Sequence, residues 1–213
     1  MRFRDRAEAG RELAGLLSAA HARGDLPDPV VLALPRGGIA VAEPVARALG
    51  APLDVLVVRK IGAPGQEEFA VGALAADDPP LFDETTLGEL GLTEESLAPV
   101  VERERRELRR REQRYRGDRP PPDLGGRTVI VVDDGLATGA TARAALRHLR
   151  RLRPARLVLA VPVGAPDSLD LLAAEADVVL CPHRPSGFAA VGQWYDDFEQ
   201  LTDTQVLAAL HGH

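Results

Sequence analysis

Short apolar runs alternate along the chain with longer stretches in which apolar and polar residues are mixed. The runs contain mainly Val, Leu, Ile and Ala, which is typical of strands buried on both faces of a sheet. The predicted strands are 30–34, 53–58, 128–132, 157–161 and 177–181. Helical spacing predicts helices at 6–23, 39–49, 140–152, 167–175 and 202–210. This alternation predicts an α/β fold, with a parallel central sheet flanked by helices and built through right-handed crossovers.

Three regions interrupt the alternation. After the second strand a Gly- and Pro-containing loop is expected at 61–67, followed by a candidate strand at 69–75. Residues 93–116 form a long charged helix that opens with the capping sequence Thr-Glu-Glu-Ser. The tail at 182–200 gathers aromatic residues in a chain that is only 4% aromatic. We therefore expect one main domain with a small C-terminal appendage.

Composition narrows the classes of function. With 213 residues, 45% of them hydrophobic, the chain can bury a sizeable core. Its net charge of -6 argues against broad binding to nucleic acids or anionic membranes. The only cysteine, Cys181, cannot form an internal disulfide, and no apolar stretch approaches the length of a membrane span. We expect a cytoplasmic protein.

The charged helix leaves two interpretations open. Its basic part, 102–119, holds nine arginines and five acids. One interpretation is a solvated helix with ion pairs between successive turns, and the other is a surface for RNA or another anion. The helix is also a candidate contact between subunits of a homo-oligomer.

The stretch 131–141, VVDDGLATGAT, carries the clearest chemical signal. Asp133 and Asp134 follow a predicted strand, at the edge of a parallel sheet where ligands bind. The small-residue loop after them leads into a helix, so backbone N–H groups and the Thr138 and Thr141 hydroxyls can surround an anion. Two carboxylates beside a phosphate cradle suit hydroxyl groups or a divalent cation. The pattern predicts a sugar phosphate as ligand.

This stretch resembles the phosphoribosyl pyrophosphate (PRPP) motif of type I phosphoribosyltransferases, in which two acids precede a loop ending Thr-Gly-x-Thr. LPRGG at 34–38 resembles the pyrophosphate loop of that family, Arg59-Lys60 lies where its mobile loop begins, and VGQWYD at 191–196 is similar to its base-holding hood. The resemblance covers nearly the whole chain. It implies a PRPP-binding core at 1–181 with a helical insertion at 84–116, then a hood segment and C-terminal helix at 182–213.

The resemblance implies transfer of 5-phosphoribosyl from PRPP to a nucleobase or related nitrogen heterocycle, with release of pyrophosphate and with Mg2+ as cofactor. The catalytic residues implied are Asp133, Asp134, Lys60 and Arg36. The implied metal ligands are Asp133, Asp134 and Asp196. The implied substrate-binding residues are Pro35, Gly37, Gly38, Arg59, Gly135, Leu136, Ala137, Thr138, Gly139, Ala140, Thr141, Trp194 and Tyr195. Arg36 and Lys60 would neutralise the leaving pyrophosphate, while the acids hold the ribose hydroxyls beside a ring that becomes positive.

Several points stay open. Lys60 is the sole lysine, retained either by chance or because arginine will not serve there. Segment 61–69 is either a lid over PRPP or an ordinary connection. The tail aromatics, Trp194 among them, either stack on a base or form a small core. Ala137 stands where hypoxanthine-guanine enzymes carry an acid, so the acceptor is not fixed.

Two other functions compete with the transferase. A regulator on the same fold would bind PRPP or a nucleotide as a signal, and RNA or DNA through the arginine-rich helix. A hydrolase or phosphorylase would act on a sugar phosphate through a metal held by the two acids. The histidines are scattered along the chain and do not indicate a metal cage.

Overall fold

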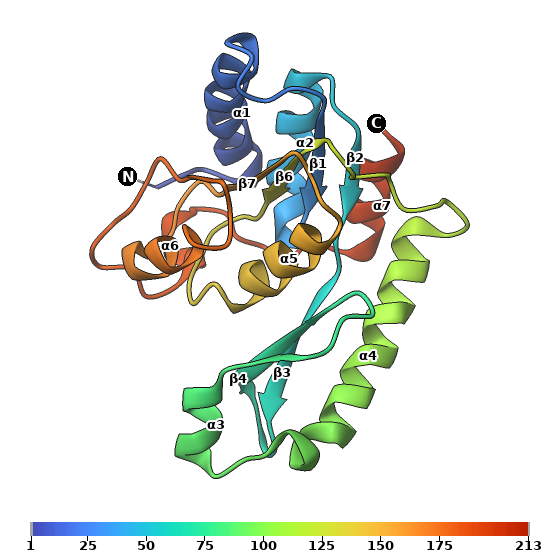
Figure 1. Ribbon diagram of the computed structural model, residues 1–213. Coiled ribbons are helices and arrows are strands. Elements are labelled where there is room, and N and C mark those ends of the chain that lie inside the picture. Colours follow the sequence, from blue (N-terminus) through green and yellow to red (C-terminus); the bar gives the residue numbers. More distant parts are fainter. Residues whose placement is uncertain (1, 213) are drawn as a thin grey trace.

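The central sheet consists of five parallel strands in the order β2-β1-β6-β7-β8 (Figure 1). Their bounds are β1 Pro29–Ala33, β2 Leu53–Val55, β6 Thr128–Val132, β7 Arg156–Ala160 and β8 Val178–Leu180. The computed structural model describes residues 2–212, apart from the side chain of Glu68. The predicted fold class, an α/β protein with a parallel central sheet, is confirmed.

Helices cover both faces of this sheet, as the doubly buried strands require. On one face lie α1 (Arg6–Ala22), α2 (Gly37–Leu49) and α7 (Asp203–His211), and on the other lie α5 (Ala140–Arg151) and α6 (Pro166–Leu172). Strand β6 shows how alternation divides the core. Ile130 and Val132 pack under α1 and α2, whereas Val129 and Val131 pack under α5 and α6. Burial of each such side chain stabilises the fold by about 1.5–3 kcal/mol.

None of the described helices is long and apolar enough to cross a bilayer.

A smaller lobe hangs below the main sheet in Figure 1. It contains a second, antiparallel sheet of β3 (Val58–Ala63), β4 (Gln66–Ala75) and β5 (Leu81–Phe82), with α3 (Glu84–Leu90) and α4 (Glu94–Arg116). The lobe therefore includes the expected insertion 84–116 and also the hairpin before it. Helix α4 runs along the lobe and returns to the main body, where Tyr115 donates a 2.6 Å hydrogen bond to Asp203 of α7.

Two predictions in this region are corrected. The single strand expected at 53–58 is split, because the chain leaves the parallel sheet after Val55. The loop expected at 61–67 is the tip of the β3–β4 hairpin. Its glycines fit this geometry: a Cβ on Gly62 would collide with the Glu67 backbone, and Gly65 turns the chain with φ +77°. The Gly and Pro content indicated the turn, but the sequence lacked a signal for the pairing on either side.

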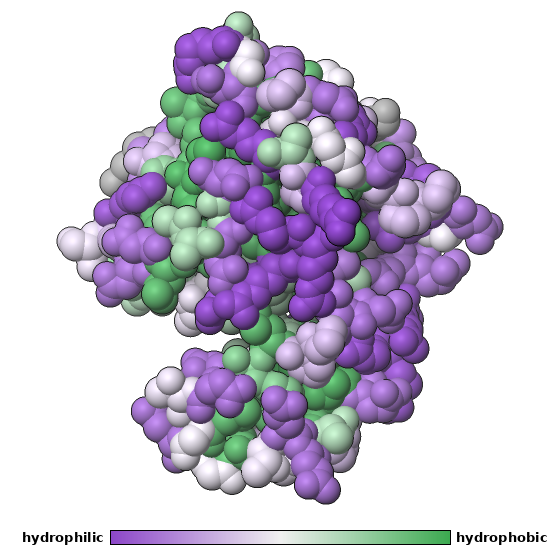
Figure 2. Space-filling model, in the orientation of Figure 1, coloured by the Kyte–Doolittle hydropathy of each residue, from purple (hydrophilic) through white to green (hydrophobic). Residues whose placement is uncertain are grey.

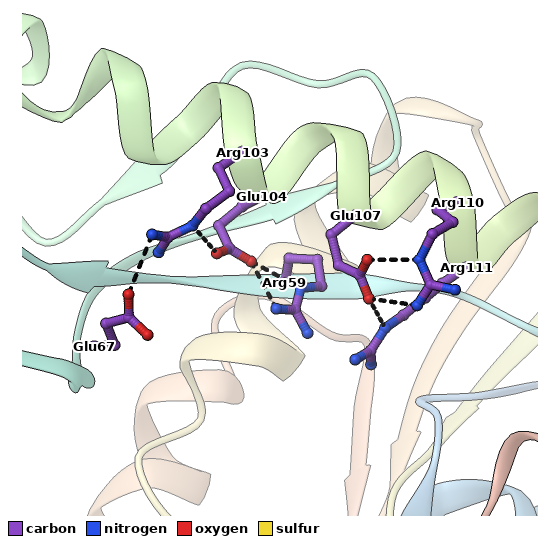
Figure 3. Close-up of polar contacts among 7 residues, drawn as sticks. All are labelled: Arg59, Glu67, Arg103, Glu104, Glu107, Arg110 and Arg111. Carbon is purple, nitrogen blue, oxygen red and sulfur yellow. Dashed lines mark hydrogen bonds and ion pairs between the residues drawn. The ribbon is translucent and has the colours of Figure 1, made fainter.

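Helix α4 is an ion-paired helix, as Figure 3 shows for part of it. The predicted capping box is present, with Thr93 and Ser96 bonded to each other's backbone N–H. Each of the nine arginines at 102–119 has a polar partner among the described residues. The partners are carboxylates or backbone carbonyls. The geometry thus favours the ion-paired interpretation over a free cationic surface.

The most buried of these pairs joins α4 to β3. Glu104, 7% exposed, accepts hydrogen bonds of 2.9 and 2.7 Å from Arg59. We expect Glu104→Gln to lower the free energy of unfolding by about 1–3 kcal/mol, because the Arg59 guanidinium loses its charged partner. Glu102→Gln, which breaks an exposed pair with Arg106, should cost less than about 0.5 kcal/mol. Urea unfolding measures both, and equal losses would show that burial adds nothing to the Glu104 pair.

Candidate active site

Asp133 and Asp134, the two acids of the stretch 131–141, stand at the carboxyl end of β6, the central strand of the main sheet. The Asp133 Oδ1 accepts a 2.8 Å hydrogen bond from the backbone N–H of Asp134. Both predicted pyrophosphate-loop glycines pack directly against these acids. A Cβ on Gly38 would lie 3.3 Å from Asp133 Oδ1, and one on Gly37 would collide with the Asp134 carboxylate. The turn from β1 into α2 therefore reaches the acids only because it lacks side chains there.

Burial makes these carboxylates electrostatically unusual. It raises the pKa of Asp133 well above its ordinary value, and the neighbouring Asp134 carboxylate raises it further. Burial also raises the pKa of Asp134, while a hydrogen bond from Arg6 opposes the rise. Charge on Lys60 favours the ionised form of Asp133. A cation or a set of hydroxyl donors arriving in this space would stabilise the charged pair.

The loop after the acids lines a cavity of about 200 Å³. The lining residues are Lys60, Val191 and the whole run 133–142. Gly139, with φ +76°, precedes α5, and no side chain caps that helix, so its first N–H groups are free to meet an anion. Two hydrogen bonds hold the loop on the side away from the cavity. The Leu136 N–H donates to the Val163 carbonyl, beyond the end of β7, and the Ser168 hydroxyl donates 2.6 Å to the Ala137 carbonyl. We call this loop, residues 135–141, the anion cradle.

The three predicted cations differ in their surroundings. Lys60 is exposed on β3, at the rim of this cavity. Arg36 is half-buried next to Pro35 at the start of α2, and no hydrogen bond or ion pair joins its side chain to another described residue. Arg59 points to Glu104 of α4, as Figure 3 shows. Lys60 is thus available to a ligand in this cavity, whereas Arg36 does not line it. Ligand contacts from Arg36 and Arg59 stay predictions.

The aromatic tail, residues 182–200, contacts the backbone of the acid pair through Tyr195. The Tyr195 hydroxyl donates 2.6 Å to the Asp134 carbonyl, and its ring is buried in a small core with Phe3. Trp194 stacks on Phe188 with ring centroids 6.2 Å apart, and its Nε1 is buried without a partner among the described residues. The small-core interpretation therefore fits Tyr195, and Trp194, which is half-exposed, packs against the same core. A contact between Trp194 and a base stays a prediction.

The expected set of three metal ligands is not assembled. Asp196 pairs with Arg2 at 3.3 Å, and both side chains are more than half exposed. Within residues 2–212, no three or more His, Cys, Asp or Glu side chains gather in a way that could hold a metal ion.

A second, larger space adjoins the anion cradle. It has a volume of about 520 Å³ and lies between the small lobe and helices α5 and α6, where Figure 2 shows the surface hollowed. It shares Lys60 and Thr138 with the first cavity, and its walls carry the exposed apolar side chains of Phe69 and Leu171. Lys60 of β3 and the part of β4 from Phe69 to Ala73 thus lie in one wall of a cleft that leads to the cradle.

Two residues of the site were not expected from the sequence. Arg6 donates a 2.7 Å hydrogen bond to Asp134 Oδ2, and Ser168 braces the cradle loop. Ser168 gave no signal, since a serine in the first turn of a helix is common. Arg6 did give one: it shares a helix face with Leu13 and Leu17, so the sequence placed a charge on an apolar stripe.

Comparisons with known proteins agree with this geometry. The family model described as "Phosphoribosyl transferase domain" matches residues 3–197. A curated Mycobacterium tuberculosis protein, provisionally named a phosphoribosyl transferase, is 43% identical over 208 residues, covering 98% of this chain and 46% of the relative. The chain thus spans about half the length of that relative.

Two further relatives extend the comparison. The "Bifunctional protein PyrR" of Chloroflexus aurantiacus is 37% identical over 131 residues, which cover 59% of this chain and 65% of that protein. The crystal structure of TT1426 from Thermus thermophilus superposes with a TM-score of 0.80 at 46% identity, covering 99% of this chain and 98% of the other. The chain belongs to the phosphoribosyl transferase domain family.

Proposed function

We propose that the chain transfers 5-phosphoribosyl from PRPP to a nucleobase or related nitrogen heterocycle and releases pyrophosphate. One observation carries the proposal: Asp133 and Asp134 share a single cavity with the anion cradle and with Lys60. The cradle would take the 5-phosphate, the acids would accept the ribose hydroxyls, and Lys60 and Arg36 would meet the pyrophosphate. As the bond to pyrophosphate breaks, the acids would lie beside the ring that gains positive charge.

The two acids also fit a magnesium ion that arrives with its ligand. Mg2+ prefers oxygen and is commonly held by one or two carboxylates together with substrate phosphates, rather than by a cage of protein ligands alone. Asp133 and Asp134 offer such carboxylates at the cavity wall, and their burial favours neutralisation by a cation. When bound, the ion would supply positive charge to the leaving pyrophosphate.

A regulatory role on nucleic acid has less support. The relatives named PyrR are described as bifunctional, but the arginines of α4 are already paired with carboxylates and carbonyls. The paired carboxylates already offset the charge of these arginines, and the net charge of the chain would oppose binding of RNA. The geometry therefore supports the transferase.

Pyrophosphate release from PRPP and Mg2+, measured against a panel of purine, pyrimidine and related bases, tests the proposal. Release with one base should be lost in Asp133→Asn with Asp134→Asn. The matched control is Asp167→Asn with Asp170→Asn, two exposed acids of α6, which should keep the wild-type rate. Tight PRPP binding without release for any base would reject the transferase, and release without any base would indicate a hydrolase.

A further inference from the structure

One buried arginine joins three parts of the molecule at Asp134. The Arg6 Nε donates 2.7 Å to Asp134 Oδ2, and its Nη1 donates 2.8 Å to the Glu199 carbonyl. Its guanidinium carbon lies 3.9 Å from the centre of the Phe198 ring. The side chains of Arg6 and Asp134 are only 10% and 13% exposed. Residues at the two ends of the chain thus meet on one carboxylate of the site.

The surroundings make this more than an ordinary ion pair. A Cβ on Gly37, in the predicted pyrophosphate loop, would lie 3.3 Å from Arg6 Nε and would collide with the Asp134 carboxylate. A buried charge pair is costly to desolvate and is weak evidence for stability on its own. Here Asp134 lines the ligand cavity, and Arg6 holds its carboxylate without lining the cavity itself. The pair therefore bears directly on a carboxylate of the site.

The two oxygens of Asp134 have different surroundings. Oδ2 is held by Arg6, while Oδ1 has no hydrogen-bond partner among residues 2–212 and Asp134 lines the cavity. We propose that Arg6 is a positioning residue: by fixing Oδ2 it turns Oδ1 toward the ribose hydroxyls, and it ties this carboxylate to the Phe198–Glu199 segment. The inference rests on the proposed function, because it requires a ribose phosphate in the cavity.

The geometry requires arginine in particular. The guanidinium donates in two directions and stacks flat on an aromatic ring at the same time. A lysine ammonium would keep the charge but would lack the planar fork, so it should hold the carboxylate less firmly. Because Arg6 contacts no part of the anion cradle in the described structure, its loss should affect recognition of the diol and spare recognition of the phosphate.

Calorimetric binding of two ligands separates these effects. Ribose 5-phosphate carries the diol, and 2,3-dideoxyribose 5-phosphate lacks it. Wild type should prefer the first, and in Arg6→Gln this preference should fall by about tenfold, the effect of one charged hydrogen bond, while the dideoxy ligand binds as before. Arg6→Lys should give an intermediate ratio. Arg11→Gln, at an exposed position on the same helix, should keep the wild-type ratio.

The possible results distinguish the role of Arg6 from the proposed transferase function. If wild type shows no preference for the diol, the proposed function fails and the inference fails with it. If wild type prefers the diol and both Arg6 variants keep that ratio, Arg6 has no positioning role. A purely structural role would weaken both ligands equally, which would also overturn the proposal. Arg6→Lys keeps the buried charge, so the test remains available should Arg6→Gln not fold.

Discussion

Asp134→Asn is expected to destabilise the protein by about 3 kcal/mol and to weaken PRPP binding at least tenfold. The stability loss follows from Arg6, whose guanidinium stays charged and would be left buried opposite a neutral amide. Asparagine can still accept the hydrogen bond, which places the loss at the low end of the range for breaking a buried pair. Urea unfolding and calorimetric PRPP titration with Mg2+ give the two values.

A double variant provides the control for this prediction. Arg6→Met with Asp134→Asn removes the buried charge altogether, so it should recover part of the stability lost in Asp134→Asn alone. PRPP binding should stay weak in the double variant, since no carboxylate has returned. If Asp134→Asn unfolds at the wild-type urea concentration, the Arg6 pair contributes nothing net to the fold.

Much of the main body could be predicted from the sequence because its signals are local. The run of β-branched residues at 128–132 predicts the strand with its observed bounds. The helix predicted at 140–152 begins at Ala140 as expected, after the turn that precedes it, and ends one residue earlier, at Arg151. Parallel strands buried on both faces leave uninterrupted apolar runs, and these are easily separated from helical spacing. The positions of the two acids and of the anion-binding loop could then be predicted, because ligands of a parallel sheet bind at the carboxyl ends of its strands.

The small lobe was harder to predict, since its structure depends on pairings between distant residues. Segment 61–67 contains two glycines and a proline, which favour a loop, and nothing local shows that 58–63 pairs with 66–75. A hairpin with a bulge at Gly62 relies on the close approach of the Glu67 backbone. Such an approach is a property of the folded pair and leaves little trace in either strand.

Some residues of the site could not be predicted from the sequence, also because they act across long distances along the chain. Arg6 lies 128 positions from Asp134, and only the fold brings them to 2.7 Å. Glu104 is a second example, because it lies 45 positions from Arg59 and binds its guanidinium. Arg59, which the sequence predicts to contact a ligand, therefore points toward α4. Sequence motifs identify groups that act through adjacent backbone, whereas side chains that orient those groups come from any part of the chain.

Replacement of Asp133 should change the stability of the protein in the opposite direction from replacement of Asp134. Asp133→Asn is expected to weaken PRPP binding at least tenfold, yet to raise the free energy of unfolding by about 0.5–2 kcal/mol at pH 8. No cationic side chain among residues 2–212 forms an ion pair with Asp133, and burial holds its pKa well above the ordinary value. At pH 8 the carboxyl ionises more favourably in the unfolded chain, where water hydrates its charge, so Asp133 makes folding less favourable when no ligand is bound.

The pH dependence of this gain has a definite sign. A carboxyl whose pKa is raised on folding binds its proton more tightly in the folded state, so it stabilises the fold at low pH. That stability is lost as the pH rises from the ordinary value near 3.8 through the raised value in the folded protein. Asparagine does not titrate, so the variant's advantage should be small near pH 4 and should grow toward pH 8.

Thermal unfolding of wild type and Asp133→Asn from pH 4 to 8, without Mg2+ or PRPP, measures this difference. Other carboxyls titrate in both proteins, such as Glu107, whose pKa the hydrogen bond from Arg110 helps lower to about 2, and the subtraction removes their contribution. A difference that stays flat with pH, or a variant less stable than wild type at pH 8, would contradict the prediction. Opposite stability changes in the two variants, with PRPP binding weakened in both, would separate the roles of the two acids. Asp134 would be stabilised by its pair with Arg6 in the fold, whereas Asp133 would act mainly on the ligand.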